Sequence, residues 1–407
     1  MSRLKNIGYT FIGNVTFSMI KWLILILIVK LTTPEQVGNY TFAMALTAPI
    51  ILFTNMRLRL RYVVEDNLIF NNVRILRNVL NVFSILIILV VGAILFPQYL
   101  SYIILVAFTK ILDLQSELYY AILHKKQNFK LISLMQIGKS IVIIIPFIVV
   151  TYFTKNVIYG LFEQILIQFL WLQFFEKRAI KYKEHEIDNY NKRLIFNIFL
   201  TGLPLGFVQM INSYNIMIPR YVIEGILSVK MVGVFASISY LLTIVDLFMN
   251  AISQNIIIKI KNFIQNKEYK KLTKYINRDV FLYSIVLGVI VIIPVYFLKD
   301  FIIGLLYGEF YRQFSNVLLI IVISIIFNFQ SWMFDTTLMA FKAYRMQLVV
   351  SIPTMVVSII ASFILVHLFG IIGASLSVVL INCTQAIIKY IIIKILIKRA
   401  TLNLETD

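Results

Sequence analysis

Residues 79–97 of this chain read VLNVFSILIILVVGAILFP, a run without a single charged side chain. A helix needs about 20 mainly apolar residues to cross the hydrocarbon core of a bilayer. Arg74 and Arg77 stand just before the run, as basic residues do at the cytoplasmic end of a membrane span. The stretch therefore predicts a transmembrane helix that begins on the cytoplasmic side.

The rest of the chain repeats this pattern. Of its 407 residues 60% are hydrophobic and only 14% are charged, and the mean hydropathy is +0.87. A soluble domain is about half apolar and a quarter charged, so a soluble fold of this length is excluded. The composition predicts an all-α polytopic membrane protein with about 12 transmembrane helices. They are expected at 10–30, 37–56, 79–97, 101–123, 131–153, 157–176, 195–217, 231–256, 280–298, 315–339, 347–367 and 370–393.

Basic residues indicate the orientation of these spans. Most of the 38 Lys and Arg residues stand in alternate gaps between the apolar segments. Short loops rich in Lys and Arg stay in the cytoplasm, so both termini are predicted to be cytoplasmic. The formal charge of +19 is then expected to face anionic lipid, and nucleic acid is not an expected partner. One cysteine, Cys383, and three scattered histidines give no metal-site spacing, and no cofactor is expected.

Two parts of the chain resemble each other. Residues 32–46 read TTPEQVGNYTFAMAL and residues 227–241 read LSVKMVGVFASISYL, with a Val-Gly pair at the same place in each. Two halves of the same orientation indicate a parallel repeat with substrate bound between the halves. The predicted organisation is two six-helix lobes around a central cavity. The lobes are expected at 1–176 and 195–407, joined by a cytoplasmic linker at 177–194.

Several basic side chains lie inside predicted spans. A charge near the bilayer centre costs about 2.5–3.5 kcal/mol, so it is expected to face the protein interior or water. Lys21 and Lys139 have no acidic residue within a helical turn of their own segment, which makes them the main candidates for cations that bind substrate in a cavity. The further candidates for cavity cations are Lys110, Lys389 and Arg220.

Two of these cations have an alternative interpretation. Lys110 shares a helix face with Asp113 and Glu117, so the three side chains also fit a self-neutralised structural cluster. Lys389 lies close to the cytoplasmic end of its span, where a lysine can extend its ammonium group to the interface.

Acidic side chains within spans are candidates for ion coupling. Asp246 and Asp335 stand on stripes of Ser, Thr and Asn, which fit either an ion site or hydrogen bonds that hold helices together. Either H⁺ or Na⁺ would serve as the coupling ion. The full set of candidates is Asp246, Asp335, Glu117, Asp113 and Glu163.

Four motifs resemble one family. They are LTTPEQVGNY at 31–40, LRLRYVVED at 58–66, NIMIPRYVIEG at 215–225 and LLYGEFY at 305–311. Together they are similar to the polysaccharide repeat-unit flippases, the Wzx-type members of the multidrug/oligosaccharidyl-lipid/polysaccharide (MOP) exporter superfamily. The resemblance implies a transporter, not an enzyme, with two six-helix lobes and a cavity that opens alternately to each side. It also implies a bacterial plasma-membrane location and a role in O-antigen and lipopolysaccharide, capsule or exopolysaccharide assembly.

The implied substrate is an oligosaccharide on undecaprenyl pyrophosphate, moved from the inner to the outer leaflet, with other polysaccharide-assembly membrane proteins as further partners. A pyrophosphate headgroup needs cations, which Lys21, Lys139 and Arg220 would supply. Capture at the cytoplasmic mouth is expected from Arg57, Arg59 and Arg61, although solvated, lipid-facing charge is the alternative for these three.

Two other function classes fit parts of the pattern. A multidrug or cation antiporter of the same superfamily would keep acidic residues unpaired for a cationic drug, and the lysines at 21 and 139 argue against it. A polysaccharide polymerase or ligase would need a sizeable exterior loop, and every predicted exterior gap is short. The sugar composition, the pathway, the coupling ion and the oligomeric state do not follow from the sequence.

Overall fold

The computed structural model describes residues 2–65, 68–180, 191–343 and 346–406. Within these ranges, side chains are not described for 2–12, 14, 244, 246–248, 250–255, 258 and 403–406. The chain forms two compact units, 1–213 and 214–407, which meet within helix α9 (Lys192–Ile226). The linker that the sequence predicts at 177–194 falls mostly outside the described residues, and the lobe boundaries stay a prediction.

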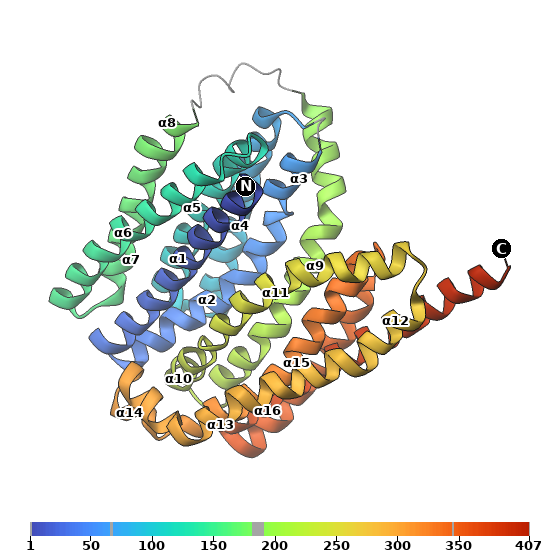
Figure 1. Cartoon of the computed structure of the whole chain (residues 1–407). Coiled ribbons are helices and arrows are strands. Elements are labelled where there is room, and N and C mark those ends of the chain that lie inside the picture. The colour runs from blue at the N-terminus through green and yellow to red at the C-terminus, as the bar shows by residue number, and fades with distance from the viewer. Residues whose placement is uncertain (1, 66–67, 181–190, 344–345, 407) are drawn as a thin grey trace. The chain divides into compact units, whose positions relative to one another are not determined.

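Unit 1 (1–213) is a helical bundle with its own core. α1 packs on α6, α6 on α7, and α5 on α2, α4 and α7, and Figure 1 shows several of these helices side by side. Its helices are α1 (Ser2–Leu31), α2 (Pro34–Asn55), α3 (Leu58–Val64), α4 (Phe70–Leu95), α5 (Leu100–Lys125), α6 (Phe129–Thr154), α7 (Val157–Trp171) and α8 (Lys177–Ala179), with a 3₁₀ turn at Pro97–Tyr99 and a π-helical turn at Leu172–Glu176.

Local sequence signals set where these helices begin. The Thr33 hydroxyl accepts a hydrogen bond from the Gln36 N–H, and Pro34 follows at the first helical position of α2, where its missing N–H costs nothing. Asn128 and Asn156 cap α6 and α7 in the same way. Between α2 and α3 the chain turns through two left-handed residues, Met56 (φ 47°) and Arg57 (φ 50°). This turn projects the arginine-rich α3 from the end of α2.

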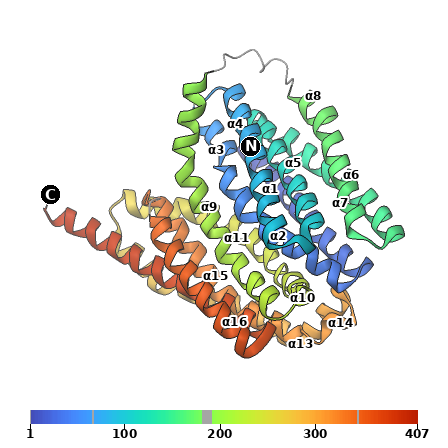
Figure 2. The same ribbon diagram turned by 180° about the vertical axis from the view of Figure 1, so that it is seen from behind.

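Unit 2 (214–407) has its own core around Met333 and Ile393. α15 packs on α11, α13 and α16, an arrangement that is visible from behind in Figure 2. Besides the second part of α9, its helices are α10 (Val229–Ser239), α11 (Leu242–Gln265), α12 (Tyr269–Lys274), α13 (Val280–Tyr307), α14 (Glu309–Arg312), α15 (Ser315–Ala340) and α16 (Met346–Thr406), with a π-helical turn at Tyr275–Asp279.

The predicted fold class is confirmed. No strand occurs in the described residues, each of the twelve predicted segments is helical there, and nine helical stretches are long and apolar enough to span a membrane. Two details differ from the prediction. The segment expected at 231–256 is interrupted at Tyr240 and Leu241, and the last two segments join in α16 across a kink at Gly370, where φ is 58°.

The repeat is clearest at the ends of α5 and α15, which both have 26 residues. Both are followed by a turn in which the second residue, Gln127 or Lys342, is left-handed. Aligned from this turn, 112–118 reads LDLQSEL and 327–333 reads FNFQSWM. The shared Gln-Ser pair places polar side chains at the same height on the central helix of each unit.

Candidate functional site

A polar cluster lies among α1, α5 and α6 of unit 1. The Asp113 carboxylate on α5 accepts a hydrogen bond from Lys21 Nζ on α1 at 2.8 Å, through Oδ2. Its other oxygen, Oδ1, accepts one from Lys139 Nζ on α6 at 3.2 Å. One carboxylate thus joins the two lysines for which the sequence showed no acid nearby. The acid comes from another helix, which spacing along the chain does not reveal.

Further polar groups surround Lys139. Its ammonium donates to Ser116 Oγ at 2.8 Å and lies 4.0 Å from Glu176 Oε1. The Tyr120 hydroxyl donates to the same Glu176 oxygen at 2.6 Å. Lys139 therefore has a full set of protein partners.

Exposure separates the two lysines. The Lys139 side chain is 1% exposed and that of Asp113 is 16% exposed, whereas the Lys21 side chain is 47% exposed and its ammonium lies 4.3 Å from the centre of the Phe17 ring. A buried ion pair is costly to break, because the remaining charge has lost its water as well as its partner. An exposed pair is worth little and exchanges readily. Lys21 is therefore the exchangeable cation of the cluster, and Lys139 is the fixed one.

Lys110, also on α5, contacts α2. Its ammonium donates to the Met44 carbonyl oxygen and to Thr47 Oγ1 on α2, both at 2.9 Å. These two hydrogen bonds involve neither Asp113 nor Glu117, so the self-neutralised cluster of the three side chains stays a prediction. The hydrogen bonds of Lys110 tie α5 to α2.

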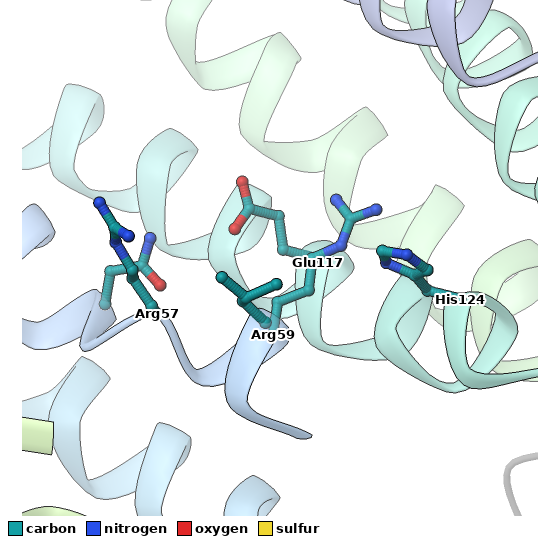
Figure 3. Close-up of a pocket in the computed structure, with 6 residues that line it drawn as sticks. Arg57, Arg59, Glu117 and His124 are labelled. Carbon is teal, nitrogen blue, oxygen red and sulfur yellow. The ribbon is translucent and has the colours of Figure 1, made fainter. Parts of the chain in front are cut away.

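A pocket of about 280 Å³ lies at the α2–α3 turn, close to the small end of the size range of ligand sites. Its lining residues are Asn55, Arg57, Arg59, Leu60, Glu117 and His124. In Figure 3 the Arg59 guanidinium lies between the Glu117 carboxylate and the His124 ring, with Arg57 on the far side of Glu117.

The charges of the pocket are unbalanced. It brings together two guanidinium groups and one carboxylate, and an imidazole adds a further donor. Guanidinium groups bind phosphate oxygens in pairs, so the pocket is chemically suited to a phosphate group. Arg59 also lies over the Tyr120 ring at 6.0 Å, which links the pocket to the partner of Glu176.

Arg61 has a different role from Arg57 and Arg59. It is buried, and its guanidinium bonds to Glu65 at 2.8 Å, to the Ile198 carbonyl oxygen at 2.7 Å and to Thr201 Oγ1 at 2.7 Å. These contacts hold α3 against α9. Arg61 is therefore occupied within the protein, and headgroup capture by Arg57 and Arg59 stays a prediction.

Unit 2 contains a second buried lysine. Lys389 Nζ on α16 donates to Asp335 Oδ2 at 2.6 Å and to Ser331 Oγ at 2.7 Å, both on α15. With its side chain only 8% exposed, Lys389 does not extend to the interface as the alternative interpretation supposed. Asp335 is the carboxylate of a cross-helix ion pair.

The remaining candidates stand apart from these clusters. Both carboxylate oxygens of Glu163 on α7 are shielded and have no hydrogen-bond partner in the described part of the chain. Arg220 on α9 is buried in unit 2. Asp246 belongs to α11, but its side chain lies outside the described ones.

Sequence reasoning assigned no role to four residues of these sites: His124 of the pocket, and Ser116, Tyr120 and Glu176 around Lys139. Ser116 follows Asp113 by three residues and so shares its helix face, which was a usable signal. Glu176 stands at the end of a predicted span, where an acid is unremarkable.

No family model matches the chain. It is 28% identical over 395 residues to the capsular polysaccharide biosynthesis protein CapF of Staphylococcus aureus, covering 95% of this chain and 98% of CapF.

Solved structures of transporters are similar in fold at low sequence identity. An inward-facing multidrug resistance MATE family transporter of the MOP superfamily matches with a TM-score of 0.75 and 14% identity over 95% of each chain. A mutant form of the MATE transporter VcmN of Vibrio cholerae matches with a TM-score of 0.65 and 13% identity over 97% of this chain and 96% of VcmN. These structures show that the chain has the fold of the MATE transporters.

Proposed function

We propose that this transporter moves oligosaccharide repeat units linked to undecaprenyl pyrophosphate from the inner to the outer leaflet of a bacterial plasma membrane. Its termini would lie in the cytoplasm, and it would work with other membrane proteins of polysaccharide assembly. The relationship to CapF supports a cargo connected with surface polysaccharide. The MOP-type fold supports transport by alternating access.

One observation carries the proposal: the pocket and the exchangeable Lys21–Asp113 pair share α5. Glu117 of the pocket follows Asp113 by one helical turn, a rise of roughly 6 Å. Arg59 on α3 and Lys21 on α1 are thus cations next to successive turns of α5. A pyrophosphate group, which carries several negative charges, suits such a succession better than a single cation.

The contacts suggest an order of events. The headgroup first binds Arg57 and Arg59, where its oxygens compete with Glu117 for the guanidinium groups. It then takes the place of Asp113 at Lys21. Asp113 stays charge-balanced during this exchange because Lys139 holds its other oxygen. Lys139 therefore acts through Asp113 and does not contact the cargo.

Coupling is proposed at Glu163. The other described carboxylates of the predicted set have cationic neighbours: Asp113 and Asp335 bond to lysines, and Glu117 faces the arginine pocket. Glu163 has no ion pair and no hydrogen bond among the described residues, so it can exchange a proton without breaking a pair. A Na⁺ ion would need several oxygen ligands. The proposed coupling ion is therefore H⁺.

A drug or cation antiporter is the second candidate, because the MATE structures are multidrug transporters by their descriptions. Such a protein needs an acidic side chain that is accessible to a cationic compound. Asp113 and Asp335 already bond to lysines, both carboxylate oxygens of the unpaired Glu163 are shielded, and the described pocket has more positive than negative side chains. These pairings favour an anionic cargo.

Flipping in proteoliposomes tests the proposal. Purified full-length protein is reconstituted with a lipid-linked oligosaccharide pyrophosphate, and the fraction of glycan that an external glycosidase reaches is followed over time. We expect faster exposure than in protein-free vesicles, and a loss of tenfold or more in the variant Arg57→Gln/Arg59→Gln.

Lys271→Gln serves as the matched control, because Lys271, on the short helix α12, is 66% exposed and pairs with Glu268 just before that helix. It should flip as fast as the native protein. A native rate equal to that of empty vesicles, with uptake of a cationic dye instead, would establish the antiporter.

A further inference from the structure

The turn between α2 and α3 has a rarely adopted backbone conformation. Met56 and Arg57 follow each other with φ of 47° and 50° and ψ of 21° and 33°, both in the left-handed region. Neither is a glycine or an asparagine, the residues that adopt this region most readily. Other residues persist in it only where their surroundings fix them, and such places concentrate at functional sites. The neighbours of this turn therefore have to supply the contacts that hold it.

Arg77 of α4 binds the end of α2 directly before the turn. Its guanidinium donates to the carbonyl oxygens of Thr54 and Asn55, both at 3.0 Å, and to Asn55 Oδ1 at 3.2 Å. These carbonyl groups belong to the last turn of α2, where no helical N–H remains to bind them. A cation at this end of a helix also interacts favourably with the helix dipole. Arg77 is only 2% exposed, so the protein encloses this cap completely.

The first half of α9 also packs against the end of α2. A Cβ atom on Gly202 would lie 3.1 Å from Met56 Sδ. One on Gly206 would lie 2.4 Å from the Phe53 carbonyl oxygen. The two glycines are four residues apart and share a helix face, so a strip of α9 without side chains lies against the turn. The glycines thus provide close packing, and Arg77 provides the hydrogen bonds.

The end of α2 that Arg77 binds is also part of the arginine pocket. Asn55 lines the pocket, and its carbonyl oxygen and side-chain oxygen are two of the three acceptors of Arg77. Arg57 follows two residues later, and Arg59 two residues after that. Their guanidinium groups lie on either side of Glu117 in Figure 3. The directions of both side chains therefore depend on the backbone of the turn.

We infer that Arg77 is a positioning residue for headgroup capture. By holding the last carbonyl groups of α2, it keeps the turn in the shape that presents Arg57 and Arg59 to the pocket, and it does not touch the cargo. Two guanidinium groups bind the oxygens of one phosphate only when both are correctly placed, so a turn that shifts weakens capture. The inference rests on the capture step proposed above and adds the residue that arranges the pocket.

Flipping in proteoliposomes, measured against the membrane density of a lipid-linked oligosaccharide pyrophosphate, tests this role. Arg77→Lys keeps the charge but loses the planar fork that reaches three acceptors at once. It should raise the half-saturating density about fivefold and leave the maximal rate within about twofold of the native value, because positioning affects binding of the headgroup. Arg77→Gln should raise the half-saturating density further. A merely structural role would instead lower the amount of active protein, and with it the maximal rate alone.

Hydrogen–deuterium exchange of the same full-length proteins, without cargo, measures the turn directly. The peptide that contains residues 53–60 should exchange about tenfold faster in Arg77→Lys than in the native protein, because the turn opens more often once its cap is weakened. Peptides from α6 and α7 should exchange at the native rate.

Two control variants separate positioning from other effects. Phe147→Leu controls for lost stability, because Phe147 is fully buried on α6 and packs against Gly160 of α7. Arg178→Lys controls for the change of an arginine to lysine, since Arg178 is exposed and lies 5.5 Å from the centre of the Phe174 ring. Neither control should raise the half-saturating density or the exchange rate at 53–60.

Two results would overturn the inference. One is exchange at 53–60 that stays at the native rate in Arg77→Lys and Arg77→Gln. The other is faster exchange together with a half-saturating density within about twofold of the native value. Should Arg77→Gln fail to fold, Arg77→Lys decides the matter. A native protein that does not flip the cargo would remove the proposed function instead, and exchange at 53–60 then decides alone whether Arg77 holds the turn.

Discussion

Ser116 and Ser331 occupy the same position in the two 26-residue helices α5 and α15, and each accepts a hydrogen bond from a buried lysine on another helix. Lys139 is the donor in unit 1, at 2.8 Å, and Lys389 in unit 2, at 2.7 Å. In both units an aspartate of the same central helix completes the pairing. Both units thus contain the same contact, in which a lysine of a neighbouring helix bonds to α5 or α15.

Replacing Lys139 by Met should destabilise the protein by about 3–5 kcal/mol, because Asp113 loses its fixed partner inside the bundle. Replacing Lys21 by Met should cost less than about 1 kcal/mol, because that end of the cluster is half-exposed. The amount of folded protein in the membrane, measured by blotting and by detergent-resistant fluorescence, separates the two variants. Equal abundance of both would contradict the assignment of fixed and exchangeable lysines.

Transport per folded molecule should depend more on Lys21 than on Lys139. Lys21→Ala is expected to reach the membrane and reduce polysaccharide export several-fold, Lys21→Arg to retain part of the activity, and Lys21→Glu to abolish it, because the cargo's phosphate needs a cation at this place. Surface glycan display, normalised to membrane abundance, gives the measurement. Full display from Lys21→Glu at normal abundance would exclude a role of this cation in transport.

The Asp335–Lys389 pair is expected to be structural. Lys389→Met leaves Asp335 without its cation and should cost about 1–3 kcal/mol, less than a fully buried pair, since the Asp335 side chain is 37% exposed. The double variant Lys389→Met/Asp335→Leu removes both charges and should regain most of that loss. Unfolding temperatures of the four proteins form a double-mutant cycle. Additive losses in the double variant would show that the two residues do not act as a pair.

Glu163→Gln should remove the dependence of transport on a pH gradient while leaving the protein folded, since no ion pair of the described residues involves Glu163. Moving one charge through 100 mV supplies about 2.3 kcal/mol, enough to bias transport strongly. Initial rates in proteoliposomes, with and without an imposed gradient, test this. Glu309→Gln, at a carboxylate that is 81% exposed, is the control. A variant that still accelerates with the gradient would rule out Glu163 as the proton carrier.

Orientation is tested by labelling single cysteines in a Cys383→Ser background. Lys155 and Lys267 form a matched pair, since both are exposed and both have left-handed backbone, with φ of 52° and 58°. A membrane-impermeant maleimide added to intact cells should label Cys at 155 and not at 267, because basic loops stay inside. Labelling of position 267 from outside would reverse the predicted topology.

Local properties of the chain determined the helices and their order. A run such as 79–97 has no way to satisfy its backbone in lipid except as a helix, so hydropathy alone located it. Caps such as Thr33 and Asn128 lie within three residues of the N–H groups that they bind, and are therefore equally readable. The charged residues within predicted spans were also identified from the sequence, because each of them interrupts an otherwise apolar run.

Tertiary structure decided which of those charges are paired. Lys21 and Asp113 are 92 residues apart and Lys139 and Asp113 are 26 apart, so the pairing depends on how α1, α5 and α6 pack. The same holds for Arg61, which the sequence groups with Arg57 and Arg59 and which the packing of α9 turns into a structural contact. Helix formation is governed by hydrogen bonds within four residues, whereas the net charge of a site depends on contacts between helices that are distant in sequence. The sequence therefore predicted where charges would enter the membrane, and only the fold showed which of them remain available to a ligand.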